Sequence, residues 1–186
     1  MVLNKISKSI GIVSKVRHLI PPNLTRMLYS SMVEPYLNYC NLIWASANTS
    51  VLLNKVLIVQ KRFIRLMTFS DYLAHSKPLF FRLYILPIYE LYRYNLAVYM
   101  FRIINNLIPP LTHHQFIFNS SIHHHNTRSK SKIHTRYCRT AMRQNTFAFQ
   151  GPKLWSELPS YLTTATSLSM FKKIAKSFFV NKICSI

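Results

Sequence analysis

Apolar residues recur at every third or fourth position along most of this chain, which is the spacing of one face of an α-helix. The first such stretch covers residues 3–19, and Pro21-Pro22 ends it because proline cannot continue a helix. Its apolar positions are Leu3, Ile6, Ile10, Val13 and Val16. The lysines of this stretch fall on the opposite side, so the pattern predicts an amphipathic helix.

A second helix is predicted over residues 24–45, with Asn23 as a suitable N-cap. Pro35 lies inside this stretch and should kink the helix or split it in two. Its expected apolar stripe is Leu28, Met32, Tyr36, Cys40 and Ile43 or Trp44.

A third helix is predicted over residues 50–68 and a short helical piece over residues 77–84. The expected stripe of the third helix is Leu52, Val56, Val59, Phe63 and Met67. Residues 88–107 are apolar almost all round, which predicts a central, largely buried helix that Pro109-Pro110 closes. Several large aromatic side chains are expected in the core, namely Trp44, Trp155, Tyr36, Tyr39, Tyr92 and Tyr99.

The character of the chain changes after residue 111. Residues 111–132 are rich in His, Ser, Lys and Arg and are expected to form a polar linker. Alternation over residues 133–138 and 147–149 suggests a short hairpin, which Gly151-Pro152 should end before a helical turn at 153–158. Ser167 is then the expected cap of a last helix, with Phe171 and Ala175 on its apolar side.

Composition sharpens this mainly α picture. The chain has 186 residues, 24 Lys and Arg against four Asp and Glu, and a formal net charge of +20. Almost half of the residues are hydrophobic (49%), so the charge does not imply disorder. The two glycines, Gly11 and Gly151, belong to no phosphate-binding loop pattern. An unbalanced positive charge of this size predicts a polyanionic partner such as nucleic acid.

The same shortage of acids argues against catalysis. Two-metal phosphoryl transfer needs several converging carboxylates, whereas this chain has only Glu34, Asp71, Glu90 and Glu157. The run His123-His124-His125 lacks the ligand spacing of a zinc site, so a solvated histidine tract is the simpler reading. Three distant cysteines predict reduced thiols and an intracellular location. We expect no metal site, no cofactor and no catalytic residue in this chain.

A membrane-associated protein is the alternative interpretation. Residues 85–108 are the most lipid-like stretch, and basic helices beside them would suit anionic lipids. Yet this stretch contains Glu90, Arg93 and Arg102, and a charge at mid-bilayer costs roughly 2.5–3.5 kcal/mol on insertion scales. No membrane span is therefore expected.

Several segments, taken in order, resemble the C-terminal part of non-LTR (LINE-type) retrotransposon reverse transcriptases. They are Lys5-Ile-Ser-Lys-Ser-Ile-Gly-Ile-Val-Ser-Lys-Val-Arg17, Leu28-Tyr-Ser-Ser, Val33-Glu-Pro-Tyr-Leu-Asn-Tyr-Cys40 with Ile43-Trp44, Val59-Gln-Lys-Arg-Phe-Ile-Arg65, His125-Asn-Thr-Arg128, Gly151-Pro-Lys-Leu-Trp-Ser-Glu-Leu-Pro159 and Ser167-Leu-Ser-Met-Phe-Lys-Lys173. The last two runs are the most specific. Cys40 departs from the family pattern, which has a small residue there.

The resemblance implies a thumb-like helical bundle over residues 1–110, the linker 111–132, and a small basic α+β or irregular C-terminal module over 133–186. It implies a fragment of an RNA-directed DNA polymerase that grips the template–primer backbone. The palm with its aspartates is absent from the sequence, so Mg²⁺ is expected only in that missing part and the chain is expected to be inactive alone. Expected partners are RNA, RNA–DNA duplex and the missing palm and fingers of the polymerase, in the cytoplasm and nucleus. The chain resembles a 5′-truncated copy or a separated fragment of the element.

A polymerase must move along any sequence, so its thumb needs cations that face the phosphate backbone rather than base edges. The predicted nucleic-acid-binding residues are Lys5, Lys8, Lys15, Lys55, Arg62, Arg65, Arg128, Lys130, Lys132, Arg136 and Arg139. The alternative for the first six is an ordinary solvated helix face. The alternative for the last five, which suit single-stranded RNA, is a flexible linker that tolerates charge.

Overall fold

The computed structural model describes residues 2–45, 50–109, 116–122, 125, 128–130 and 132–184. Within these ranges the regular structure is helical, apart from one isolated antiparallel bridge between Phe118 and Ile133. The predicted mainly α class is therefore confirmed. The chain groups into two compact units: unit 1 contains Met1–Asn41, Thr49–Leu91 and Phe178–Ile186, and unit 2 contains Leu42–Asn48 and Tyr92–Ser177. The domain boundaries expected at residues 110 and 132 stay a prediction.

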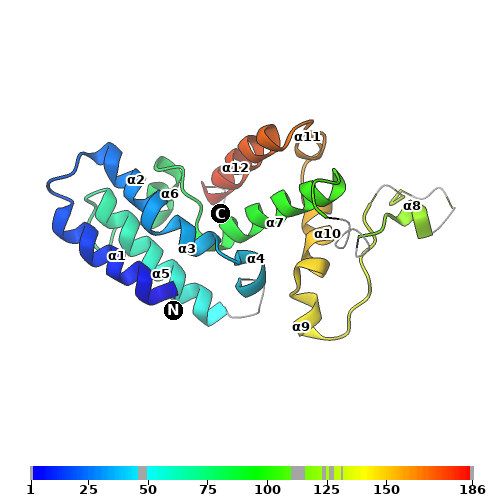
Figure 1. Ribbon diagram of the computed structural model, residues 1–186, viewed down its shortest axis with the longest axis horizontal. Coiled ribbons are helices and arrows are strands. Elements are labelled where there is room, and N and C mark those ends of the chain that lie inside the picture. Colours follow the sequence, from blue (N-terminus) through cyan, green and yellow to red (C-terminus); the bar gives the residue numbers. More distant parts are fainter. Residues whose placement is uncertain are drawn as a thin grey trace. The chain divides into compact units, whose positions relative to one another are not determined.

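Unit 1 is built mainly on α1 (Val2–Val16), α2 (Pro22–Met32), α3 (Glu34–Asn38), α5 (Ser50–Met67) and α6 (Ser76–Arg82). Helices α1 and α5 lie side by side, and α2 and α3 follow one another along them (Figure 1). The core between them includes Ile6, Val13, Val33, Leu37 and Phe63, which are fully buried. Helix α1 therefore buries Ile6, Ile10 and Val13 of its predicted stripe, half-buries Leu3 and Val16, and leaves its lysines exposed.

The predicted second helix is split, as Pro35 suggests, with Pro35 in the first turn of α3. A further break follows at Cys40, whose φ of 48° lies in the left-handed region, before α4 (Asn41–Trp44). The cap predicted at Asn23 is wrong, because α2 begins at Pro22 and Pro21 is its N-cap. Proline fits the first helical position, since the N–H it lacks would have no partner within the helix.

The buried row of α2 to α4 lies one residue beyond the predicted stripe. It consists of Thr25, Tyr29, Val33, Leu37 and Asn41. Cys40 and Ile43 are exposed, and Tyr39, expected in the core, is 76% exposed. The two rows are neighbours on a helix, and the buried one carries more polar atoms, so hydrophobicity alone selects the wrong row.

Helix α5 shows a related correction. Leu52, expected in the stripe, is 52% exposed, while Gln60 is fully buried. The Gln60 side chain donates from Nε2 to Tyr29 Oη at 2.8 Å and to the Leu86 carbonyl oxygen at 2.9 Å. Its Oε1 accepts from the Ile88 backbone N–H at 3.0 Å. Ile88 is the first residue of α7 (Ile88–Ile104), so a side chain from another element binds an N–H that the helix itself cannot pair.

Unit 2 contains most of α7, together with α8 (Asn119–Ile122), α9 (Ala141–Gln144), α10 (Phe147–Glu157), α11 (Ser160–Thr163) and most of α12 (Leu168–Cys184). Aromatic rings join its helices: Phe171 stacks on Phe101 with ring centroids 4.5 Å apart and lies 5.9 Å from Trp155. Met100 and Ile103 of α7 pack with Ile133. The predicted core placement of Trp155 is consistent with this packing. Tyr92 was also expected in the core, and its partial burial raises the pKa of its hydroxyl to about 12.

The predicted hairpin is wrong. Residues 147–149 are the first turn of α10, and the helix continues through Gly151 and Pro152, where a break was expected. Three alternating residues fit a helical turn as well as a strand, so this short pattern carried little information. A Cβ built on Gly151 would lie 2.5 Å from Met100 Sδ, which means that glycine here permits a close approach of α10 to α7.

The last helix begins as predicted. The Met170 backbone N–H donates to Ser167 Oγ at 3.2 Å, so Ser167 caps α12. Phe171 and Ala175 are fully buried, and Lys173 is exposed.

Candidate nucleic-acid interface

A shallow cavity of about 200 Å³ lies between α1 and α5 in unit 1. Ser7, Gly11 and Ser14 line it from α1, at positions that share one helix face. From α5 it is lined by Val59, Arg62 and Leu66. A Cβ built on Gly11 would meet no atom within 4 Å, so this glycine is not required for packing and leaves the cavity open.

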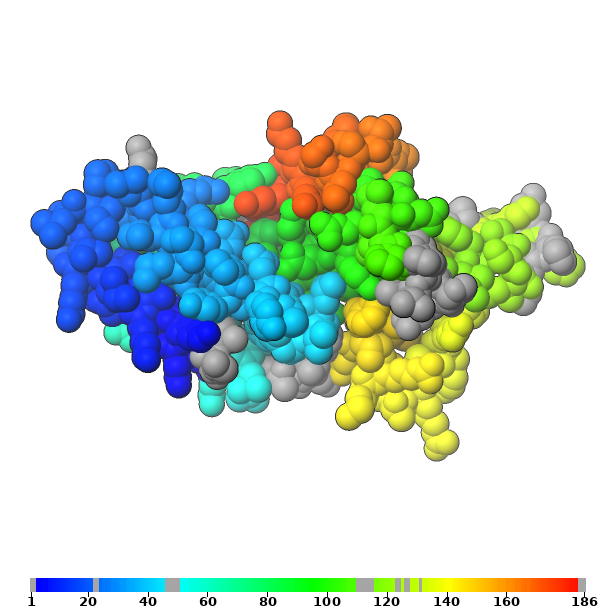
Figure 2. All heavy atoms as spheres, in the orientation of Figure 1, coloured from blue at the N-terminus to red at the C-terminus, as the bar shows by residue number. Residues whose placement is uncertain are grey.

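Both helices that form this cavity carry exposed cations. Lys8 and Lys15 are seven residues apart on α1, and Lys55 and Arg62 are seven apart on α5, so each pair lies on one side of its helix. Neither helix contains an Asp or Glu. We call the cavity, together with these four cations on the two helices that form it, the α1–α5 groove. Side chains of α1, dark blue in Figure 2, stand out from the surface.

The groove continues into a second cavity of about 300 Å³, because Arg62 and Leu66 line both. Arg17 and Arg65 also line this second cavity. The Arg17 guanidinium lies over the Phe69 ring, 5.4 Å from its centroid. Asp71 is the one acid among the lining residues, and its Oδ1 accepts from the Tyr72 backbone N–H at 2.7 Å. Three guanidinium groups against one carboxylate make this end of the groove strongly positive.

Two of the predicted residues in unit 1 have other contacts. Lys5 Nζ lies 5.0 Å from the centroid of the Tyr36 ring, a cation–π contact on the side of α1 that faces α3. Arg65 Nε donates to the Ala74 carbonyl oxygen at 2.9 Å and so holds the loop that follows α5. The structure therefore places Lys8, Lys15, Lys55 and Arg62 on two adjacent helices, with Arg62 in the lining of the cavity, whereas Lys5 contacts Tyr36.

The second basic block lies in unit 2. Its predicted members are all exposed, namely Arg128, Lys130, Lys132, Arg136 and Arg139. Part of the predicted linker is held by the backbone, because the N–H groups of Asn119 and Ser120 donate to the carbonyl oxygens of Lys132 and Lys130 at 3.0 and 3.1 Å. His123 and His124 lie outside the described residues, and His125 is exposed.

A third cavity, of about 350 Å³, lies between residues 134–143 and the first turn of α10. We call it the α10 pocket. Its basic lining residues are His134, Arg136 and Arg143, and the rings of Phe147 and Phe149 supply apolar surface. Phe147 is held edge-on by Tyr99, with centroids 5.5 Å apart and ring planes at 88°. Residues 134–149 are yellow in Figure 2.

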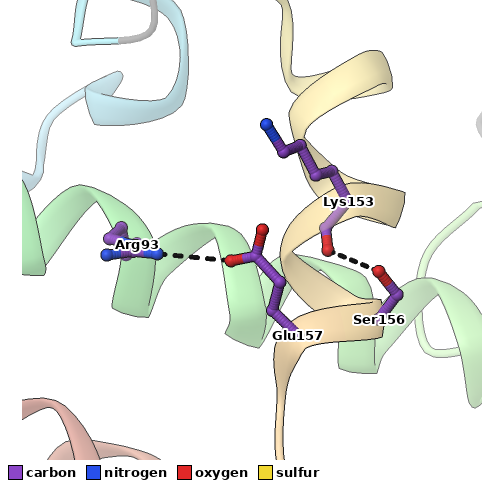
Figure 3. A network of polar contacts seen from close by, with 4 residues as sticks. All are labelled: Arg93, Lys153, Ser156 and Glu157. Carbon is purple, nitrogen blue, oxygen red and sulfur yellow. Dashed lines mark hydrogen bonds and ion pairs between the residues drawn. The ribbon is translucent and has the colours of Figure 1, made fainter.

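Glu157 is the only acidic residue in the sequence of unit 2, and it is already engaged. Its Oε2 lies 3.4 Å from Arg93 Nη2, which joins α10 to α7 (Figure 3). The Lys153 side chain points away from this pair, while Ser156 Oγ donates to the Lys153 carbonyl oxygen at 2.8 Å. No carboxylate lines the α10 pocket, so its arginines are not neutralised there.

Within the described ranges, no three His, Cys, Asp or Glu residues come close enough together to hold a metal ion. Cys40 is exposed and Cys138 is buried, and both are free thiols. Likewise, none of the described helices combines the length and apolarity needed to cross a membrane.

Comparisons with models of known protein families, with curated proteins and with solved structures gave no match.

Sequence reasoning missed Arg17 and the small residues of the groove floor. The signal for the floor was present, since Ser7, Gly11 and Ser14 follow helical spacing beside Lys8 and Lys15. Arg17 follows the end of α1, and the packing of α1 against α5 brings it to the cavity that Arg62 and Arg65 line.

Proposed function

We propose that this chain is a nucleic-acid-binding C-terminal fragment of a LINE-type retrotransposon reverse transcriptase, which grips the template–primer backbone and does not polymerise alone. The α1–α5 groove carries this proposal. Its four exposed cations lie on two adjacent rigid helices that contain no acid. A surface of this kind suits phosphates and offers no arrangement of base-reading side chains.

The groove floor also supports backbone contact. Serine hydroxyls and a glycine line it from α1, so a sugar-phosphate strand could approach the helix closely. Ser14 Oγ now donates to the Gly11 carbonyl oxygen at 2.9 Å, and its hydroxyl keeps acceptor capacity. The guanidinium cluster at Arg17, Arg62 and Arg65 extends the positive surface beyond one end of this floor.

The salt dependence of binding tests the proposal quantitatively. Contact of about four cations with phosphates predicts a slope of log K against log salt of roughly −3 to −4. Affinity for an RNA–DNA duplex should then fall about 100-fold between about 50 and 200 mM salt. Fluorescence anisotropy with duplexes of unrelated sequence measures both the slope and the expected lack of sequence preference.

A matched pair of variants locates the contact. The variant Lys8→Gln/Arg62→Gln removes two groove cations and should reduce the slope by about 2. The control Lys77→Gln/Arg82→Gln removes the same two residue types from exposed positions of α6, outside the cavities of the groove. Equal slopes for the two variants would show that net charge, and not the groove, governs binding.

Two further assays separate this proposal from its rivals. Primer extension by the purified chain with Mg²⁺ would contradict the claim that the fragment is inactive alone. Flotation with anionic vesicles, with RNA duplex as competitor, tests the membrane alternative: vesicles that retain the chain against excess duplex would favour it. We expect the duplex to release the chain.

A further inference from the structure

The α10 pocket has a different chemical character from the α1–α5 groove. It is a cavity of about 350 Å³, within the size range of small-ligand sites, and it combines cations with aromatic rings. The groove also carries cations, but small and aliphatic side chains accompany Arg62 in its lining, and no aromatic ring is among them. A ligand for the pocket therefore needs both negative charge and a flat apolar surface.

The anionic part of such a ligand would meet Arg136 and Arg143. Both side chains are exposed, and both line the pocket. The first turn of α10 adds backbone donors, because Thr146 Oγ1 donates to the Arg143 carbonyl oxygen at 2.7 Å and does not cap the helix. Phe149 and Gln150 both donate their N–H to the Thr146 carbonyl oxygen, so the N–H groups of Phe147 and Ala148 are those that the helix leaves unpaired.

His134 supplies an oriented polar group on the pocket wall. Asn119 Nδ2 donates to the Ser129 carbonyl oxygen at 2.9 Å, which fixes the amide so that Oδ1 faces His134 Nδ1 at 3.2 Å. Because Oδ1 can only accept, Nδ1 is the donor in this contact, which holds the His134 ring in place on the pocket wall.

The flat part of the ligand would meet the rings. Phe147 and Phe149 line the pocket, and the edge-on contact with Tyr99 fixes Phe147 in place. Tyr137 and Met142, on the same segment, are 91% and 85% exposed. Aromatic rings next to basic side chains are typical of sites that stack unpaired bases.

We infer that the α10 pocket binds one unpaired nucleotide of a single strand, with its phosphate at Arg136 and Arg143 and its base against the phenylalanine rings. This inference rests on the proposed function, because the nucleotide is taken to be part of the nucleic acid that the groove is proposed to bind. It assigns single-strand capture to unit 2, separate from the duplex contact that the groove provides.

The test compares a blunt RNA–DNA duplex with the same duplex that carries a single-stranded RNA extension, using the full chain and fluorescence anisotropy. The extension should raise affinity about tenfold, which corresponds to one stacked base. A 2-aminopurine base in the extension should lose fluorescence on binding, because stacking quenches it. An extension that gives no gain in affinity overturns the inference.

Two double variants make the test specific. Arg136→Gln/Arg143→Gln should abolish the tenfold gain and the quenching. Lys153→Gln/Lys173→Gln removes the same charge from exposed positions of α10 and α12 that do not line the pocket, and it should keep both. A gain that survives in the first variant, or is lost equally in both, overturns the inference.

The outcomes for the two proposals are distinct. Salt-dependent binding of the blunt duplex with no gain from the extension leaves the groove proposal intact and refutes the pocket. Capture of a single strand that depends on the pocket, without binding of the blunt duplex, leaves the pocket inference intact and refutes the groove proposal. A poly-glutamate competitor that displaces the extension as well as RNA of equal charge would refute base stacking and favour an acidic peptide.

Discussion

Gln60 is a buried polar residue on which three separate parts of unit 1 depend. Its amide bonds the Tyr29 hydroxyl of α2, the Leu86 carbonyl that precedes α7, and the first N–H of α7. Both N–H donors of the amide are therefore used, and Oε1 uses one of its two acceptor lone pairs. Burial raises the pKa of the Tyr29 hydroxyl, whose oxygen accepts the bond from Gln60.

We predict that Gln60→Met lowers the free energy of unfolding by about 3 kcal/mol, because it leaves buried groups on three elements without a partner. Methionine has nearly the same shape, so lost packing contributes little. Tyr29→Phe removes one bond of the three and should cost only about 1 kcal/mol. Urea denaturation of both variants measures the difference, and equal stability of Gln60→Met and the wild type would refute the account.

At the scale of elements, Gly151 shows why α10 can pack closely against α7. In most helices Gly→Ala stabilises, by about 1 kcal/mol. Here the added methyl would lie 2.5 Å from Sδ of Met100, which is fully buried. Overpacking of a core costs about 1–3 kcal/mol, so it should outweigh the propensity gain.

We predict that Gly151→Ala lowers stability by about 1 kcal/mol in the wild type and raises it by about 0.5–1 kcal/mol in a Met100→Ala background. The smaller side chain at position 100 leaves room for the new methyl group, so only the propensity gain remains. A double-mutant cycle by thermal denaturation gives the coupling energy. Additive effects would mean that Met100 moves aside at no cost and that the close approach is not a constraint.

The hydrophobic period predicts the long helices α1, α5, α7 and α12, because each spans at least four turns and buries one side or nearly all sides. It fails at α10, where Phe147 and Phe149 alternate over too few residues to distinguish a strand from a helix. It also selects the wrong row of α2, because tertiary contacts bury Thr25 and Tyr29 there. No local pattern reveals that Gln60 is buried, since its partners lie 26 to 31 residues away in sequence.

In the candidate site, too, the local sequence pattern predicts some features, whereas others depend on tertiary packing. The sequence identifies Lys8, Lys15, Lys55 and Arg62 as cations that lie away from apolar stripes, and all four are exposed. Their grouping depends on the packing of α1 against α5, about 50 residues further along the chain, which spacing does not encode. The α10 pocket depends on a helix whose first residues the sequence pattern assigns to a hairpin. The sequence therefore did not predict that Phe147 and Phe149 would line one cavity with Arg136 and Arg143.

At the scale of the whole molecule, the formal charge of +20 opposes folding and promotes binding to polyanions. The chain has 24 Lys and Arg against four Asp and Glu, and the Arg93–Glu157 ion pair, with side chains 33% and 49% exposed, contributes little. Most cations therefore repel one another without compensation. Salt shortens the Debye length from about 10 Å at 0.1 M to about 3 Å at 1 M, which weakens this repulsion and also weakens contact with phosphates.

We predict that added NaCl raises the melting temperature of the free chain while it lowers affinity for RNA–DNA duplex, so the two measurements have opposite slopes against salt. A gain of about 1 kcal/mol would raise the melting temperature of a chain of this size by about 2–4 °C. Differential scanning fluorimetry measures the first slope and anisotropy the second. The variant Lys77→Glu/Lys153→Glu/Lys173→Glu adds acids at exposed positions outside the α1–α5 groove and the α10 pocket, so it should gain less stability from salt. A melting temperature that falls with salt would show that attractive ion pairs, and not uncompensated cations, dominate the electrostatics of the fold.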